Sequence, residues 1–283
     1  MPSPGADRIT VTDRFPTVTV VRSAERDRWR DGAVDSRQSF PATGAFDLAA
    51  GAFGALLIHN DDVVGPGEGF EVHDHRDVEI VTWVLAGRVR HTDRAGHTGV
   101  VGPGQVQRIS AGRGISHTEH NAAGALERER LRVVQMWIAP DTAGGDPGYA
   151  QADFSGALSA GDPVTVVSGL ARDAGSPALA IGNSQVALHI ARPRPGRPIT
   201  LPGARYGHLF VATGSAEVSV DHGDGPAEKP VALGAGDALR VGDAGQLTVT
   251  ASSPGGAAAA PGDEADAPTE ILYWEMHAGL AGR

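Results

Sequence analysis

Short runs of β-branched and apolar residues, each closed by a glycine or a proline, recur along most of this chain. Val78 to Leu85 (VEIVTWVL) is soon followed by Gly87, and Leu131 to Ile138 (LRVVQMWI) by Pro140. Segments of this length and spacing are typical of a β-sandwich or a β-barrel. A doubly wound sheet would need a helix after each strand, and the pattern predicts only a short helix over Ser23 to Trp29. We therefore expect an all-β fold.

A second series of strands is predicted beyond a Gly-, Pro- and Asp-rich join at Ala143 to Tyr149. Its members are Val186 to Ala191, His208 to Ala212, Ala216 to Val220, Ala238 to Val241, Gln246 to Thr250 and Glu270 to Met276. A chain of 283 residues has room for two cores of ordinary size. We expect two tandem β-barrels, formed by residues 1–145 and 146–283. The Ala-, Gly- and Pro-rich stretch Ser252 to Pro268 is predicted to be a mobile surface loop.

Charge and composition exclude several classes of function. The chain has 24 Lys and Arg against 34 Asp and Glu, a net charge of −10, and no basic stripe, so nucleic acid is not an expected partner. The absence of cysteine excludes disulfides, thiolate metal ligands and a cysteine nucleophile. Residues 1–14 do not read as a secretory signal, and no run of about 18 apolar residues is present. We expect a cytoplasmic protein with no membrane partner.

Two histidines one residue apart, His73 and His75, are followed further along the chain by a second alternating pair, His117 and Glu119. Side chains at i and i+2 of a strand point to the same face, so each pair can direct both groups into one cavity. Three imidazoles and one carboxylate suit a divalent transition metal with coordination positions left open. The alternative is a chance row of surface histidines, because the chain contains 11 of them.

The two halves of the chain share landmark glycines, with Gly87 matching Gly214 and Gly104 matching Gly236. Aligned on these glycines, the second half carries no ligand residue at the positions of the four candidates. Those positions are occupied by Thr200, Pro202, Val249 and Ala251. The repeat therefore predicts one metal site, in the first barrel.

Glycine-bounded strands that carry such groups match the two-part cupin signature, a small β-barrel that binds a metal in its mouth. In greater detail the chain resembles the pirin family, and most closely the bacterial pirin-like bicupins. The motifs that carry the resemblance are Asn60-Asp61-Asp62, Gly69-Phe70, His73-Asp74-His75-Arg76-Asp77-Val78-Glu79, Gly102-Pro103-Gly104, the Ala111 to Glu119 run and Gln135-Met136-Trp137-Ile138. These motifs are specific, and the match spans almost the whole chain.

The resemblance implies a bicupin with one metal-bearing cupin domain and a second cupin domain without metal. The metal ligands that it implies are His73, His75, His117 and Glu119. Many cupins use the carboxylate at Glu79, which the resemblance instead makes a supporting group. One departure is Asp74, where relatives usually carry proline, so the backbone that enters the site is less restricted and a negative charge is added.

The function that the resemblance implies is that of a metal-dependent dioxygenase of the quercetin 2,3-dioxygenase type. Its substrates would be a small phenolic molecule and O2, and Glu119 would accept the hydroxyl proton. One divalent ion is expected, Fe first, with Ni, Co, Mn, Cu and Zn as alternatives, because the ligand set does not select among them. The competing hypothesis is a non-enzymatic, redox-sensitive metal-binding protein that regulates a protein partner. A zinc-dependent sugar isomerase on a cupin barrel is a third reading.

The remaining histidines show no ligand spacing. His91 and His97 flank a predicted hairpin, where we expect them to be solvated, and His120 has the opposite strand parity to the ligand pair. His59 precedes the polar run Asn60 to Asp62, which is predicted to be a turn. We expect Arg76 and Arg113 to form salt bridges around the barrel mouth rather than to recognise a substrate oxygen.

Overall fold

The computed structural model describes residues 18–40, 47–221, 229–253 and 267–280. Within these ranges the regular structure is almost entirely β, with one α-helix, α1 (Ser155–Leu158), and two 3-10 turns, η1 (Ser23–Glu25) and η2 (Ala171–Asp173). The all-β prediction is confirmed. Most of the predicted loop Ser252 to Pro268 lies outside the described residues.

The helix predicted over Ser23 to Trp29 is wrong, because only the 3-10 turn η1 forms there and strand β2 (Asp27–Arg30) follows it. Across the β2–β3 hairpin, Arg28 and Arg30 both donate to the carboxylate of Asp35, each with a contact of 2.7 Å. Opposite charges on neighbouring strands stabilise such a pairing, and a seven-residue helix has little stability of its own.

The N-terminal barrel consists of two sheets that close over one another. The larger has seven strands in the order β12-β9-β6-β11-β4-β3-β2, and the smaller has the order β5-β10-β7-β8. The strands not yet bounded are β3 (Val34–Gln38), β4 (Leu56–Val64), β5 (Gly69–His75), β6 (Glu79–Ala86), β7 (Val89–Asp93), β8 (Thr98–Val101), β9 (Gln105–Ser110), β10 (Ile115–Asn121), β11 (Leu131–Ile138) and β12 (Gly148–Asp153).

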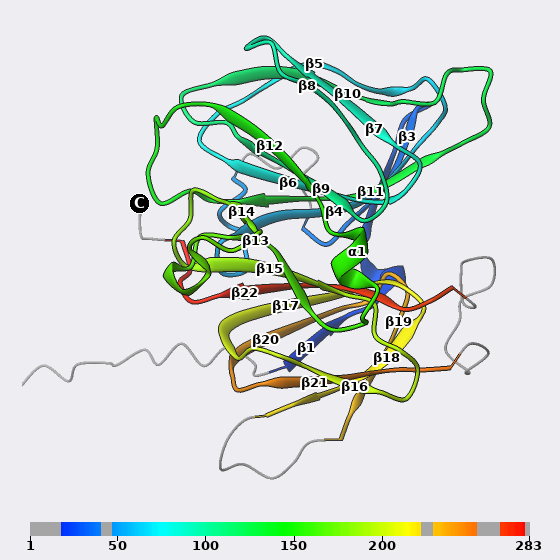
Figure 1. Cartoon of the computed structure of the whole chain (residues 1–283), viewed down its shortest axis with the longest axis vertical. Helices are drawn as coiled ribbons and strands as arrows, with labels where there is room; N and C mark the ends of the chain where they lie inside the picture. The colour runs from blue at the N-terminus through cyan, green and yellow to red at the C-terminus, as the bar shows by residue number, and fades with distance from the viewer. Residues whose placement is uncertain (1–17, 41–46, 222–228, 254–266, 281–283) are drawn as a thin grey trace, which may run out of the picture.

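The C-terminal barrel repeats this plan. Its larger sheet has the order β1-β20-β17-β22-β15-β13-β14, and its smaller sheet has the order β16-β21-β18-β19. The strands are β1 (Val18–Val21), β13 (Val164–Ser168), β14 (Leu179–Ala180), β15 (Val186–Ala191), β16 (Pro198–Leu201), β17 (Ala204–Thr213), β18 (Ser215–Val220), β19 (Val231–Gly234), β20 (Ala238–Ala244), β21 (Leu247–Ala251) and β22 (Glu270–Met276). Two barrels built on one plan make the chain a bicupin, and Figure 1 shows them stacked along the long axis.

The landmark glycines occupy the same backbone conformation in both barrels. Gly87 and Gly214 have φ of 70° and 68°, and Gly104 and Gly236 have φ of 81° and 83°. Positive φ at a tight turn favours glycine because it lacks a Cβ atom. The faint sequence repeat therefore reflects equivalent turns in two equivalent barrels.

Each barrel contains one edge strand from the other half of the sequence. β1, at the start of the described residues, pairs antiparallel with β20, and β12 pairs antiparallel with β9 of the first barrel. In Figure 1 the blue β1 lies among the strands of the lower barrel. The division at residues 1–145 and 146–283 stays a prediction.

The largest apolar cluster lies between the barrels, where the two seven-stranded sheets face each other. It joins Trp83 and Met136 of the first barrel with Phe210 and Trp274 of the second. Trp274 Nε1 lies 3.1 Å from Met136 Sδ, and Trp83 Nε1 donates to Glu270 at 2.5 Å. β6 is buried on both faces because one packs on this interface and the other on the barrel interior.

The interior of the second barrel is filled by aliphatic side chains. When Gly87 and Gly214 are aligned, the hydrogen-bonded register places aliphatic residues at the positions of the predicted ligands. His73, His117 and Glu119 correspond to Leu201, Leu247 and Val249. For β10 the structural match differs by two residues from the sequence alignment, which paired His117 with Val249. The cause is the connection before the strand, because residues 245–246 connect β20 to β21 whereas residues 111–114 connect β9 to β10. A packed apolar lumen has no donor atoms for an ion.

Candidate metal centre

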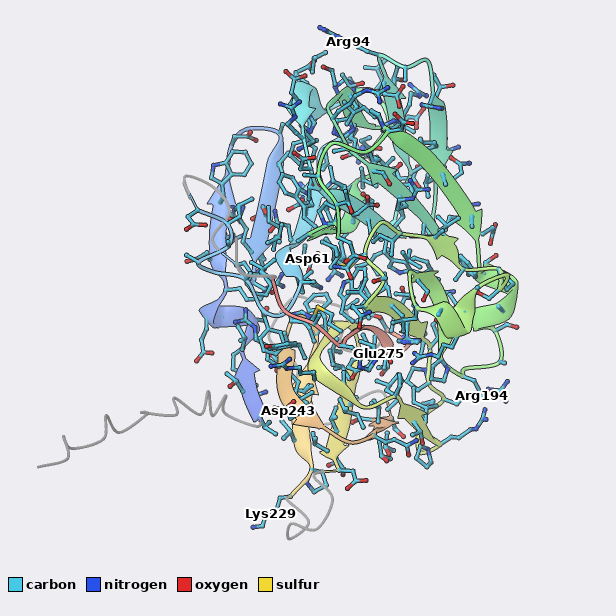
Figure 2. All side chains as sticks on the ribbon, turned by 90° about the vertical axis from the view of Figure 1, so that its left-hand side faces the viewer. Asp61, Arg94, Arg194, Lys229, Asp243 and Glu275 are labelled. Atoms are coloured by element: carbon cyan, nitrogen blue, oxygen red, sulfur yellow. The ribbon has the colours of Figure 1, made fainter. Side chains whose placement is uncertain are left out.

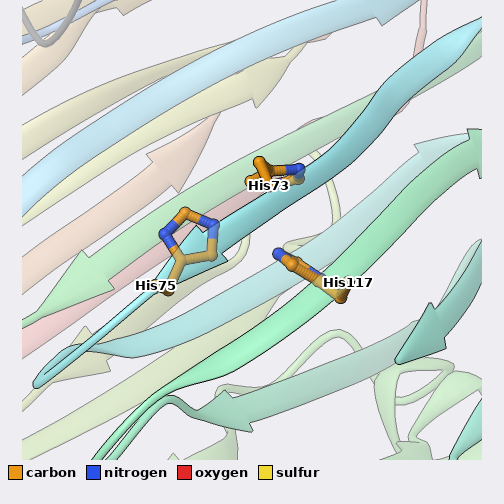
Figure 3. Close-up of side chains that lie close together, drawn as sticks. All are labelled: His73, His75 and His117. Atoms are coloured by element: carbon orange, nitrogen blue, oxygen red, sulfur yellow. The ribbon is translucent and has the colours of Figure 1, made fainter. Parts of the chain in front are cut away.

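Three of the four predicted ligands meet at the mouth of the first barrel. β5 and β10 are antiparallel neighbours with His73 directly opposite His117, and His75 lies on the same face as His73. Ring centroids are 4.4 Å apart for His73 and His117 and 5.0 Å apart for His75 and His117. One ligand nitrogen from each ring lies within 4.8 Å of the other two. Figure 3 shows the three rings gathered from the two strands.

The hydrogen bonds and pKa values of this cluster favour neutral rings with nitrogen lone pairs available to a cation. His73 Nδ1 lies 2.7 Å from the carbonyl oxygen of Glu71, which leaves Nε2 as the acceptor, and the buried His117 Nε2 has no hydrogen-bond partner. Burial and the neighbouring imidazole of His73 lower the pKa of His75 to about 4, and burial with His73 and His75 lowers that of His117 to about 3. Neutral imidazoles around one point fit a divalent transition metal.

Glu119 lies beside this cluster on the same face of β10 as His117, and a β-bulge in β5 lies opposite the step between them. Its carboxylate is buried and receives the side-chain amides of Gln107 and Gln135, the latter at 2.7 Å. It forms a compact group with His117 and a fourth histidine, His91, rather than with all three clustered histidines. Its role as the fourth ligand stays a prediction.

Glu79 lies at the start of β6 and belongs to no compact ligand group among the described residues. Ser110 Oγ donates to its carboxylate at 2.7 Å, and burial raises its pKa. Asp74 lies outside the cluster, on the opposite face of β5, where Ser116 Oγ donates to it. Neither Glu79 nor Asp74 belongs to the compact group formed by the three histidines.

His91 is the site residue that the sequence reading missed. We expected it to be solvated at a hairpin, and this is wrong, because its side chain is 0% exposed. The ring of Tyr149 on β12 stacks on it, with centroids 4.5 Å apart and planes inclined by 13°. The signal was in β7: Val89 points inward, so residues 91 and 93 share its face.

The predicted turn at Asn60 to Asp62 is also wrong, because these residues lie inside β4 and pair with both β3 and β11. Asn60 and Asp62 point into the first barrel, and Asp61 points to the inter-barrel side. Burial raises the pKa of Asp62 to about 7.

A cavity of about 330 Å³ adjoins two of the three histidines. His73 and His75 lie on its wall with Phe70 and Trp137, and the Trp137 ring meets His75 edge-on at 4.8 Å. The other lining residues are Trp29, Val34, Ser36, Gln38, Leu48, Ile58, Asn60, Asp62 and Gln135. The size and the mixed apolar and polar wall suit a small organic molecule.

A more open cleft lies on the outer side of His75, toward the end of the barrel that carries Arg94 in Figure 2. Arg76, Arg94 and Arg113 line it. Arg113 forms an ion pair with Asp146, and Arg76 lies 4.0 Å from Asp77. Two of the three arginines therefore have acidic neighbours, as expected for the barrel mouth.

Comparison with known proteins places this architecture in a family. The profile described as Pirin matches residues 20–138. A protein of Mycobacterium tuberculosis named "Putative quercetin 2,3-dioxygenase" is 41% identical over 265 residues, which are 93% of this chain and 97% of that protein. The chain belongs to the pirin family.

Two further relatives of this pirin-family chain are informative. An Escherichia coli K12 protein named quercetin 2,3-dioxygenase is 40% identical over 133 residues, 47% of this chain and 56% of that protein. The crystal structure of the bacterial pirin YhhW from Escherichia coli in complex with nickel(II) has a TM-score of 0.73 and 27% identity, and covers 92% of this chain and 99% of that one.

Among the described residues, no helix has the length and apolar character needed to cross a bilayer.

Proposed function

We propose that this pirin-family protein is a metal-dependent dioxygenase that acts on a small phenolic substrate, with quercetin as its test compound. The observation that carries the proposal is the meeting of three imidazoles, His73, His75 and His117, beside a cavity of about 330 Å³. The names of the relatives support the same reaction class.

The proposed ligands are the three clustered histidines and Glu119, and the proposed resident ion is Fe(II), with Ni, Co, Mn, Cu and Zn as alternatives. When bound, such an ion supplies a Lewis acid for a hydroxyl oxygen and, if redox-active, an electron path to O2. The protein supplies neutral nitrogen donors on two rigid strands. Gln107 and Gln135 hold the carboxylate of Glu119 beside His117.

The cavity walls account for the proposed substrate class. Phe70, Trp137 and Ile58 offer flat or apolar contacts to an aromatic ring, while Gln38 and Asn60 offer hydrogen bonds to hydroxyl groups. In the proposed reaction Glu119 accepts the proton of the substrate hydroxyl, because it is buried and its carboxylate oxygen lies within 4.8 Å of a ligand nitrogen of His117.

The reaction is tested with protein stripped by a chelator and reloaded separately with Fe(II), Ni, Co, Mn, Cu or Zn. Loss of quercetin absorbance, O2 uptake and carbon monoxide release are followed together. We expect turnover with at least one ion and none in the stripped protein. An absence of turnover with every ion, together with specific retention of a protein partner by the metal-loaded form, would support the regulatory hypothesis instead.

The role of Glu119 is tested by Glu119→Gln, which keeps the shape and removes the proton acceptor. We expect kcat to fall by about 100-fold or more while part of the metal remains bound. The matched control is Glu127→Gln, in an exposed loop, which should retain the wild-type rate. Near-normal turnover by Glu119→Gln would exclude proton acceptance at this residue.

A further inference from the structure

A line of hydrogen-bonding side chains runs from the predicted ligand His117 to the surface. His117 Nδ1 lies 3.3 Å from His91 Nδ1, and His91 Nε2 lies 3.3 Å from Asp93 Oδ2. Asp93 Oδ2 in turn lies 2.9 Å from Nδ1 of His97. His91 and Asp93 have no exposed side-chain surface, whereas the His97 side chain is 44% exposed.

The protons along this line can be assigned from donor and acceptor capacity. The Asp93 carboxylate only accepts, so the proton between it and His91 lies on His91 Nε2. A neutral imidazole has one donor and one acceptor nitrogen, so His91 Nδ1 is the acceptor. His117 Nδ1 must then be the donor in the contact between the two rings. The lone pair of His117 is left on Nε2, the buried nitrogen that has no partner.

Two members of this line, His91 and Asp93, are also fixed in place by their surroundings. Tyr149 stacks on the His91 ring, and its hydroxyl donates to Gln151 Oε1 at 2.8 Å. Asp93 Oδ1 accepts the backbone N–H of His97 at 2.9 Å, which closes the β7–β8 turn on the carboxylate. The His91 ring and the Asp93 carboxylate therefore cannot turn freely.

We propose that His91 and Asp93 are positioning residues that hold His117 with its proton on Nδ1 and its Nε2 lone pair available to a metal. This inference rests on the proposed metal site and adds two residues to it. A histidine ligand is oriented by the group that its other nitrogen contacts, and loss of such a group typically weakens metal binding by about 10-fold to 100-fold.

Asp93→Asn tests the proposal because it keeps the shape of the side chain and exchanges donor and acceptor in each hydrogen bond from residue 93 to His117. The Asn carbonyl must stay on the His97 backbone N–H, which is a fixed donor, so the NH2 group faces His91 Nε2. His91 then accepts at Nε2 and donates from Nδ1 to His117 Nδ1. His117 would carry its proton on Nε2, where it opposes a metal. A carboxylate-to-amide change beside a functional histidine acts in this way in the serine protease triad.

Two measurements are made on each variant. Nitrogen-15 long-range correlation spectra of metal-free, histidine-labelled protein report the tautomer of His117, and chelator competition reports the affinity for Zn²⁺. We expect Asp93→Asn to change His117 from the Nδ1–H to the Nε2–H form and to weaken Zn²⁺ binding at least tenfold. The control His120→Gln, on the opposite face of β10, should leave both readouts at the wild-type values.

A second variant keeps the proposal testable if Asp93→Asn folds poorly. His91→Phe retains a ring against Tyr149 but removes both nitrogens, so His117 loses its tautomer preference and Zn²⁺ affinity should again fall at least tenfold. Unchanged Zn²⁺ affinity and an unchanged His117 tautomer in a folded variant would overturn the proposal. Wild-type protein that binds no Zn²⁺ but shows His117 as Nδ1–H would refute the metal site while leaving the tautomer assignment standing.

Discussion

Single buried polar residues in this protein are stabilised by several donors at once, and Glu275 is the clearest case. His189 Nε2 and His277 Nε2 contact its two carboxylate oxygens at 2.9 Å and 2.6 Å, and Arg172 also donates to it. Burial acts to raise the pKa of Glu275, but the hydrogen bonds from His189, Arg172 and His277 outweigh it and lower the pKa from 4.5 to about 2.

Glu275→Gln should therefore destabilise the protein in a pH-dependent way. A carboxyl group whose pKa is lower in the folded state stabilises above its unfolded pKa, and this contribution is lost as the pH falls from 4.5 toward 2. We expect the variant to lose about 3 kcal/mol of unfolding free energy at pH 7, and much less near pH 2. Urea denaturation across this pH range measures the difference. An equal loss at both ends would contradict the ionic origin.

Strand parity predicted which of the candidate ligand residues share a strand face, while the residues around them were not predictable. His73 with His75, and His117 with Glu119, lie two residues apart on one strand and so share a face. The burial of His91 depends on Tyr149 of β12, which is the last residue of the predicted join between the halves. No local pattern contains that contact. The distance of Glu119 from His73 and His75 is also set by pairing, because β5 has an extra residue opposite the step from His117 to Glu119, and bulges have no reliable sequence signal.

At the scale of elements, the site depends on the close approach of β5 to β10. Gly69 lies opposite His120 at the end of this ladder, close to the bulge of β5 between Phe70 and His73. A Cβ atom at position 69 would lie 2.3 Å from the carbonyl oxygen of Glu119 and 2.3 Å from the ring of His120. Such distances are well inside van der Waals contact, so the two strands would have to separate.

Gly69→Ala should therefore weaken both the fold and the metal site. We expect a loss of about 1–3 kcal/mol in unfolding free energy and weaker Zn²⁺ binding, because β5 carries two of the three clustered histidines. Thermal unfolding and chelator competition measure the two effects. Gly32→Ala is the control, since nothing lies within 4 Å of its added methyl group. Full Zn²⁺ affinity in Gly69→Ala would show that the site tolerates strand separation.

Strands were easier to predict than the connections between them. Leu131 to Ile138 coincides with β11, and Glu270 to Met276 with β22, because long apolar runs closed by a turn residue have few other solutions. Asn60 to Asp62 was misread as a turn because polar residues in a central strand oppose its propensity. The cavity inside the first barrel explains why two of these polar residues lie in a strand, because Asn60 and Asp62 line it.

At the scale of the whole molecule, a buried ionic contact joins the two barrels. Arg132 donates through Nε and Nη2 to the two oxygens of Asp61, both at 3.0 Å, and through Nη2 to the carbonyl oxygen of Ala212 in the second barrel. Arg26 lies 3.9 Å from Asp61 and has no exposed side-chain surface. Figure 2 shows Asp61 at mid-height, at the level where the barrels meet.

Arg132→Met should destabilise the protein by about 3–5 kcal/mol, because it leaves the Asp61 carboxylate buried without its bidentate partner. The double variant Arg132→Met with Asp61→Leu should recover part of this loss, since paired apolar residues can replace a buried ion pair at little cost. Denaturant unfolding of the single and double variants gives both values. A double variant less stable than Arg132→Met alone would show that the charges stabilise the interface in their own right.

The exchange of edge strands has a consequence for how the protein is made. β1 precedes the other described strands in the chain, yet its partner β20 is among the last of them, and until β20 is made β1 has an unsatisfied row of backbone groups. The first barrel likewise lacks a flanking strand until β12 has emerged. The first barrel can therefore be completed while the chain is growing, whereas the second must wait for β20, and its completion joins an early strand to one of the latest.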